Sequence, residues 1–190
     1  MTRHSFLRLS RSQDRRPTSP PTPAHPHNRT RADTPPKHTL NETLRLYPVV
    51  PFNVRVALHD TTLPHGGGAT GNQPIGILKD TPIGYSTLVL QRREDLYPPG
   101  AAPLAFAPER WDAWTPRGWT YIPFNGGPRI CVGQQFALTE MAYTVVRIFQ
   151  RFAGVDDRMD GVRVGLKADI VLQPSAGVRV AFWEDGKVEE

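Results

Sequence analysis

The sequence predicts a mixed fold of helices and small β-sheets. Residues 134–152 form the best candidate helix, because apolar side chains recur there at intervals of three and four. A shorter helix is expected over 38–47, where Leu40 and Leu44 lie on one stripe before Pro48 ends it. In the longer helix the stripe comprises Leu138, Met141, Val145, Ile148, Phe149 and Phe152, and we expect most of it to be core.

Short β-rich runs bounded by Gly and Pro surround the longer helix, and they predict the sheets. Before it the runs are 53–58, 61–63, 75–78 and 85–90, and after it they lie at Val162/Val164/Leu166, 170–172 and 178–182. The segment 66–71 formally matches the dinucleotide pattern G-x-G-x-x-G. Because 72–74 reads Asn-Gln-Pro and cannot open a phosphate-binding helix, we predict a turn or loop there.

Charge divides the chain into two regions. Residues 1–38 carry eight Arg and Lys against two Asp, whereas 39–190 carry fifteen against sixteen acids. The first region is polar, has seven prolines and closes at Pro35-Pro36, so we expect a disordered tail. The second region is near neutral and is expected to fold. This removes the main electrostatic argument for nucleic-acid binding, which rests on the tail alone.

The first residues of the chain also bear on its cellular location. Residues 1–12 are rich in Arg and Ser and lack acids, as in a mitochondrial transit peptide, although Asp14 and the prolines after it interrupt the amphipathic pattern. No apolar run in the sequence approaches the length of a membrane span. A single cysteine excludes an internal disulfide framework and suits a reducing compartment.

The glycine-rich loop 124–133 contains this cysteine, Cys131, and is the most informative segment. A thiolate needs positive potential and backbone donors, and a helix expected to start near Val132 would point its first amides toward the sulfur. A lone cysteine can also be a small buried hydrophobe. All six histidines precede residue 66 and no second thiol exists, which disfavours a histidine-activated nucleophile and a zinc site.

The loop fits the pattern F-x-x-G-x-R-x-C-x-G, and the chain thereby resembles the cytochrome P450 family of heme-thiolate monooxygenases. The matching residues are Phe124, Gly126, Arg129, Cys131 and Gly133. The resemblance implies that Cys131 is the axial ligand of a heme iron and that Arg129 binds a heme propionate. It also implies a mainly α fold with small β-sheets, of which this chain would be the C-terminal portion.

Two further segments extend the resemblance. Residues 42–45 match the family's E-x-x-R and residues 108–111 match its P-E-R-[FW], which implies a structural triad of Glu42, Arg45 and Arg110 around the cysteine loop. Taken alone, an exposed i,i+3 ion pair would look the same. Arg55 stands where family members send an arginine to a heme propionate, and the alternative is an ordinary charge on a strand surface.

The implied activity is insertion of one oxygen atom of O2 into an organic substrate, with electrons from NADPH delivered by a reductase at the endoplasmic reticulum membrane. Residues 62–68 and 91–97 resemble the fungal branch that hydroxylates alkanes and fatty acids. The reductase would approach near Arg117 or Arg147, unless these are scattered surface charges. Residues 174–176 would touch the substrate or form a plain surface turn.

One family motif is not found in the sequence, the oxygen-activating [AG]-G-x-[DE]-T. The resemblance spans about residues 39–182 and includes the proximal side of the heme, without the helices that cover the distal side. We therefore expect the 190-residue chain alone to hydroxylate poorly. The alternative function is a heme-binding remnant, or a truncated gene product, without catalysis.

Overall fold

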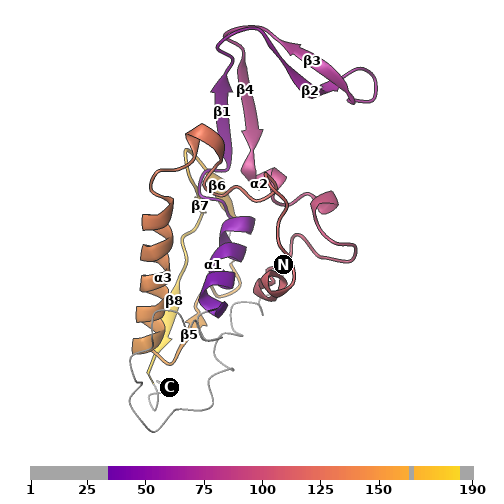
Figure 1. Ribbon diagram of the computed structural model, residues 1–190. Coiled ribbons are helices and arrows are strands. Elements are labelled where there is room, and N and C mark those ends of the chain that lie inside the picture. The colour runs from indigo at the N-terminus through magenta and orange to yellow at the C-terminus, as the bar shows by residue number, and fades with distance from the viewer. Residues whose placement is uncertain (1–33, 163–164, 185–190) are drawn as a thin grey trace, which may run out of the picture.

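The computed structural model describes residues 34–162 and 165–184. Helix α1 (Thr34–Leu46) lies beside the longer α3 (Gln134–Arg151), and two paired strands rise from one end of this helix pair (Figure 1). Most of the predicted tail lies outside the described residues. Residues 34–38 are helical, so α1 begins four residues before the predicted helix start at 38. Pro35 and Pro36 lie in the first helical turn, where a missing N–H costs no hydrogen bond.

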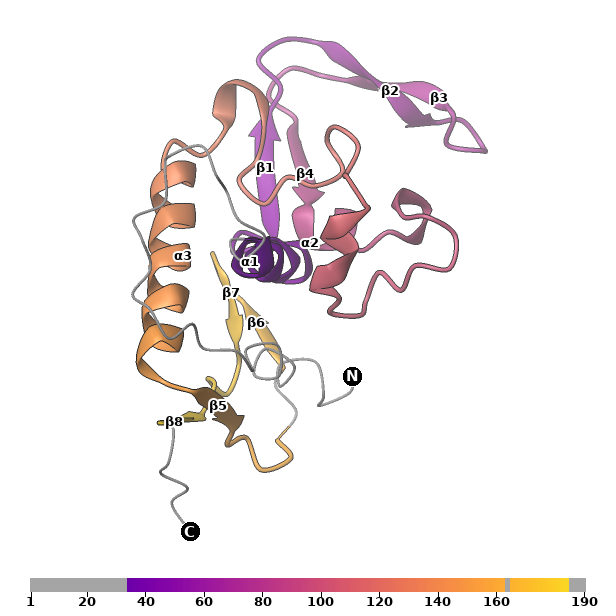
Figure 2. The same cartoon turned by 60° about the horizontal axis from the view of Figure 1, so that its bottom comes forward.

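The core is small and centres on α1. The helix ends at Leu46, as expected from the bias against helical backbone before Pro48. Seen from the second viewpoint, α1 lies end-on between α3 and the segment that carries α2 (Thr87–Leu90) (Figure 2). The buried apolar residues include Leu44, Leu46, Ala57 and Met159 together with Pro48 and Pro51, and the buried polar ones are Glu42, Arg45, Thr87 and Gln91. Hydrogen-bonded polar groups therefore form a large part of this core.

Four strands form two antiparallel pairs on the N-terminal side of α3. β1 (Phe52–Val56) pairs with β4 (Pro82–Ser86), and β2 (Thr61–Gly67) pairs with β3 (Gln73–Ile77). The β2–β3 pair projects away from the helices (Figure 1). Residues 68–72 turn between β2 and β3, so the turn predicted over 66–71 is confirmed for 68–71, whereas residues 66 and 67 are the end of β2.

The strand predicted over 85–90 is wrong beyond Ser86, where the chain turns into α2. The Oγ atom of Ser86 accepts a hydrogen bond from the Val89 amide at 3.2 Å and caps the helix. Side-chain capping thus outweighs the β-propensity of this apolar run.

Helix α3 matches the predicted span 134–152 to within one residue, but its apolar stripe is only half-buried, and α3 has no fully buried residue. Among the described residues α1 is the main element packed against it. The terminal strands form two further antiparallel pairs, in which the β5 strand was not predicted. They are β5 (Gly154–Asp157) with β8 (Val180–Trp183), and β6 (Leu166–Ala168) with β7 (Leu172–Pro174). Predicted strand residue Val164 lies outside the described residues.

Helices do not predominate among the described residues, since strands hold about as many residues as α-helices. The mainly α character implied by the resemblance is therefore not found in this part of the chain. The long connection between α2 and α3 contains three short 3₁₀ helices, which are Glu94–Leu96, Pro108–Asp112 and Gly127–Arg129. Within the described ranges, no helix combines the length and the apolar character needed to cross a bilayer.

Candidate functional site

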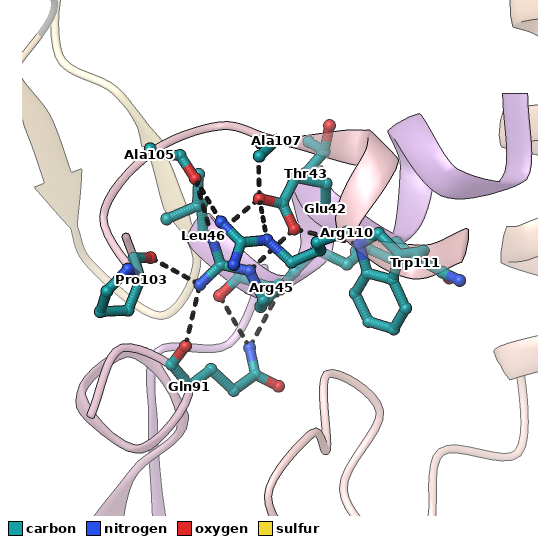
Figure 3. Close-up of polar contacts among 12 residues, drawn as sticks. Glu42, Thr43, Arg45, Leu46, Gln91, Pro103, Ala105, Ala107, Arg110 and Trp111 are labelled. Atoms are coloured by element: carbon teal, nitrogen blue, oxygen red, sulfur yellow. Dashed lines mark hydrogen bonds and ion pairs between the residues drawn. The ribbon is translucent and has the colours of Figure 1, made fainter. Parts of the chain in front are cut away.

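Glu42 is the centre of a buried polar network (Figure 3). Its carboxylate is fully buried and accepts two hydrogen bonds from Arg45, at 2.8 and 2.9 Å, and one from Arg110 Nε at 3.0 Å. The backbone amide of Ala107 and the indole Nε1 of Trp111 donate two more, at 2.9 and 3.0 Å. The structure thus brings Glu42, Arg45 and Arg110 together through one carboxylate, with every acceptor direction of that group in use.

Arg45 extends the network to chain segments far away in sequence. Its Nη1 donates to the carbonyl oxygens of Gln91 and Pro103 at 3.2 and 2.7 Å, and to the hydroxyl of Tyr97 at 2.9 Å. Its Nη2 donates to the Ala105 carbonyl at 3.2 Å. One buried guanidinium therefore joins α1 to the connection that follows α2. A planar fork of five donors is suited to this task in a way that an ammonium is not.

The ionisation of this network follows from its geometry. Burial by itself would raise the pKa of Glu42, but the hydrogen bonds from Arg45 and the Ala107 amide, with the charges of Arg45 and Arg110, outweigh it and lower that pKa. Burial would lower the pKa of Arg45, and the Glu42 carboxylate reverses this and raises it. Both groups are therefore held in their charged forms.

Sequence reasoning missed Gln91, Tyr97 and Trp111. The fully buried Gln91 donates from Nε2 to the carbonyl oxygens of Leu44 and Arg45, at 3.1 and 3.0 Å. A side-chain amide directly after the apolar run 88–90 was the available signal, since such an amide requires partners when it is buried. For Trp111 the signal was its place at the last position of the P-E-R-[FW] match, whereas Tyr97 carried no comparable signal.

The cysteine loop follows Tyr121, whose ring packs edge-on against Trp111 at 4.9 Å between centroids. The amide of Cys131 donates to the Phe124 carbonyl at 2.9 Å, which closes the loop. Helix α3 begins at Gln134, the start of the predicted span 134–152, and not near Val132 as expected from the cysteine loop. The Gln134 amide donates to the Cys131 carbonyl. The cysteine side chain is exposed. Within the described residues the expected amide donors to its sulfur are not found, and the neighbouring Val132 is fully exposed.

A pocket of about 380 Å³ lies beside this loop. It is lined by Arg55, Tyr85, Trp119, Ile122, Asn125, Gly126, Gly127, Pro128 and Arg129. The structure therefore brings together both arginines that the resemblance assigns to heme propionates. Arg129 has no hydrogen-bond or ion-pair partner in the described part of the chain, and Arg55 donates only to the carbonyl of its neighbour Val54.

Two glycines of the motif have different structural roles. A Cβ atom on Gly126 would lie 2.6 Å from the Cζ3 atom of Trp119, so a side chain there would displace the indole ring that forms one wall of the pocket. Gly133 is the residue before α3, and a Cβ atom there would make only an ordinary contact, 3.9 Å from the Cys131 sulfur. The contacts in the described structure therefore explain why residue 126 is a glycine, and they do not explain the glycine at 133.

The two arginines predicted to face a reductase are both exposed, and Arg147 lies on α3, where it donates to Gln150 at 3.0 Å. Residues 174–176 run from the last residue of β7 into a surface turn, and the Ser175 amide donates to the Gly165 carbonyl at 2.9 Å. That geometry describes a turn and holds no feature specific to a substrate.

Comparison with known proteins gives the family. Residues 37–179 match the family model "Cytochrome P450", and these residues include the loop, the triad and both pocket arginines. The chain belongs to the cytochrome P450 family. It is 56% identical over 160 residues to cytochrome P450 monooxygenase pvhE of Talaromyces variabilis, covering 80% of this chain and 30% of that relative. It is similar also to cytochrome P450 monooxygenase alt2 of Alternaria solani, with 52% identity over 75% of this chain and 26% of the relative.

A third relative, cytochrome P450 52A1 of Candida tropicalis, is 52% identical over 63% of this chain and 22% of its own length. The chain thus spans less than a third of the curated relatives it matches.

Cytochromes P450 bind heme, and the residues present fit that group. Two guanidinium groups line one pocket, as two propionates require, and Arg129 has no competing partner among the described residues. The loop beside them presents an exposed thiol, and Gly126 leaves the ring of Trp119 room to cover the loop.

Proposed function

We propose that this chain provides the proximal heme-binding portion of a cytochrome P450 monooxygenase. The observation that carries the proposal is the exposed Cys131 on a loop whose residues share a pocket with Arg55 and Arg129. In this proposal Cys131 would ligate the heme iron, Arg129 and Arg55 would bind the propionates, and Phe124, Gly126 and Gly133 would shape the loop. When bound, the heme supplies the iron at which dioxygen is activated, and thiolate ligation favours O–O cleavage there.

The residues of this chain have the tasks of binding and orientation. The Phe124 carbonyl holds the Cys131 amide at 2.9 Å and so fixes where the thiol leaves the backbone. Arg55 and Arg129 offer bidentate donors to carboxylates, which would orient the porphyrin plane relative to the loop. The Glu42 network keeps α1 and the connection after α2 in fixed positions behind that loop.

The proposed reaction inserts one oxygen atom of O2 into a fatty acid or an alkane, with electrons from NADPH through a reductase at the endoplasmic reticulum membrane. Its support is the resemblance of residues 62–68 and 91–97 to the fungal fatty-acid and alkane hydroxylases, together with the identity to cytochrome P450 52A1. The reductase would approach the loop side of the molecule, with Arg117 as an exposed positive charge. Arg147 is also exposed, but it lies 13 residues from the loop end of α3, which puts it about 20 Å away along the helix.

Heme reconstitution tests the proposal. The chain is loaded with heme, reduced and exposed to carbon monoxide, and we expect a Soret band near the thiolate position that is lost in Cys131→Ser. Because the Cys131 side chain is exposed, this substitution should leave the far-UV circular dichroism unchanged. Val132→Ala, at the adjacent fully exposed position, is the matched control and should retain the band. A thiolate band that survives Cys131→Ser, or a folded chain that binds no heme, contradicts the proposal.

A further inference from the structure

Asn125 uses both ends of its side chain to hold the cysteine loop on the β1–β4 pair. Its Oδ1 accepts a hydrogen bond from the Tyr85 hydroxyl at 2.6 Å, and its Nδ2 donates to Oδ1 of Asn53 at 2.9 Å. The residue has a φ of +64°, in the left-handed region that asparagine tolerates better than most side chains. Its own amide donates to the Ile122 carbonyl at 3.0 Å.

The two partners of Asn125 come from different strands but from one point of the sheet. Asn53 on β1 lies directly opposite Tyr85 on β4 in the antiparallel register. Side chains at such a position are about 5 Å apart, so one amide group can bridge them. Both hydrogen bonds therefore form only when β1 and β4 are correctly paired and the loop lies beside this residue pair of the two strands.

Tyr85 also contacts a pocket arginine. The guanidinium carbon of Arg55 lies 5.6 Å from the centroid of the Tyr85 ring, a distance at which the cation is attracted to the ring face. Arg55, Tyr85 and Asn125 all line the pocket that contains Arg129. One tyrosine thus holds the loop through its hydroxyl and an arginine through its ring.

We propose that Asn53, Tyr85 and Asn125 form a clamp that positions the cysteine loop and Arg55 relative to each other. The clamp deepens the proposed function, on which its role toward heme rests. Its members are positioning residues, since they act through Cys131 and Arg55. Without the clamp, the distance between the loop that carries the Cys131 thiol and the strand that carries the Arg55 guanidinium could vary. A rigid heme could then not contact both groups at once.

Amide hydrogen exchange in the full chain without heme tests the clamp directly. In Tyr85→Phe, which keeps the ring and loses the hydroxyl, the amides of Asn125 and Cys131 should exchange about tenfold faster, as expected for loss of one hydrogen bond. The amide of Tyr47 at the end of α1 should be unchanged. Tyr143→Phe, at an exposed tyrosine of α3, is the matched control and should change nothing.

Asn125→Gly provides a second variant, because glycine accepts the positive φ and removes only the side-chain contacts. We expect it to accelerate exchange in the loop at least as much as Tyr85→Phe. Unchanged exchange in the loop in both variants would overturn the clamp. So would an equal acceleration at Tyr47, since that result indicates general destabilisation.

Heme-loaded protein tests the positioning role separately. The fraction of the ferrous carbon monoxide complex with the thiolate signature should fall in Tyr85→Phe and Asn125→Gly and stay at the wild-type value in Tyr143→Phe. Faster loop exchange with an undiminished thiolate fraction would overturn the positioning role. If the wild-type chain binds no heme, the proposed function fails, and the exchange measurement still decides whether the clamp exists.

Discussion

The side chain of Gln91 accepts a hydrogen bond from the backbone amide of Ile122 at 2.9 Å. Its other end donates to the carbonyl oxygens at the end of α1, so a single buried amide joins the E-x-x-R helix to Ile122, two residues before the cysteine loop 124–133. The Ile122 carbonyl in turn accepts from Asn125. Gln91 and the Asn125 clamp therefore hold the same loop from two sides, one on the helix and one on the sheet.

Gln91→Ala should destabilise the protein strongly. It leaves the Ile122 amide and two α1 carbonyls without their partner in a fully buried position. Because each buried unsatisfied group costs about 1–3 kcal/mol, we expect the free energy of unfolding to fall by at least about 2 kcal/mol in urea titrations. Gln150→Ala, at an exposed glutamine of α3, is the control and should change it by less than about 0.5 kcal/mol. Similar values for the two variants would contradict the role of Gln91.

Glu42→Gln should also destabilise the fold. The variant keeps the size of the side chain but leaves the buried Arg45 without a counter-charge and forces an amide nitrogen toward N–H donors. Breaking a buried ion pair by removing one partner typically costs about 3–5 kcal/mol. The matched control is Asp95→Asn, which removes the exposed pair with Arg93 and should leave the urea midpoint unchanged. If both variants had the same midpoint, the buried network would not contribute to stability.

Some of this arrangement follows from sequence and some does not. The apolar period of 134–152 predicted α3 to within one residue, because a local repeat directly encodes a helix face. The resemblance of residues 42–45 and 108–111 to family motifs implied that Glu42, Arg45 and Arg110 meet, and they meet at one carboxylate. The partners of Asn125 and Gln91 were not predictable, because they lie 31 to 72 positions away in sequence and depend on strand register and on the path of the chain after α2.

Periodicity alone overestimated the burial of α3. A helix with the period of α3 normally buries its apolar stripe, yet the stripe is half-buried because α1 is the main element that packs on it in the described structure. Large apolar side chains such as Val132, Phe136 and Leu58 are exposed. Periodicity states which face is apolar, whereas the number of layers that cover this face is a property of the tertiary structure.

The stability of the fold should depend on pH through Glu42. Since the folded-state pKa of this carboxyl lies below its ordinary value of 4.5, its contribution is complete above 4.5 and is lost as the pH falls through the folded value. Urea midpoints measured from neutral pH down into this acidic range should therefore decrease in the wild-type chain and decrease less in Glu42→Gln. Asp95→Asn, the exposed control, should follow the wild-type profile. Identical slopes in all three proteins would show that Glu42 is not the titrating group.

Gly126→Ala should reshape the pocket while leaving the fold intact. The new methyl group would lie 2.6 Å from Trp119 Cζ3, and because Trp119 is 65% exposed its ring can swing outward instead of straining the backbone. We expect a shift of Trp119 fluorescence, identified by difference from Trp119→Phe, and faster heme loss because one pocket wall has moved. Gly118→Ala is the control, since a Cβ atom there meets no atom within 4 Å. Heme loss at the wild-type rate in Gly126→Ala would mean that the indole is not part of the binding surface. Faster heme loss without a shift of Trp119 fluorescence would mean that the methyl group acts on another part of the loop.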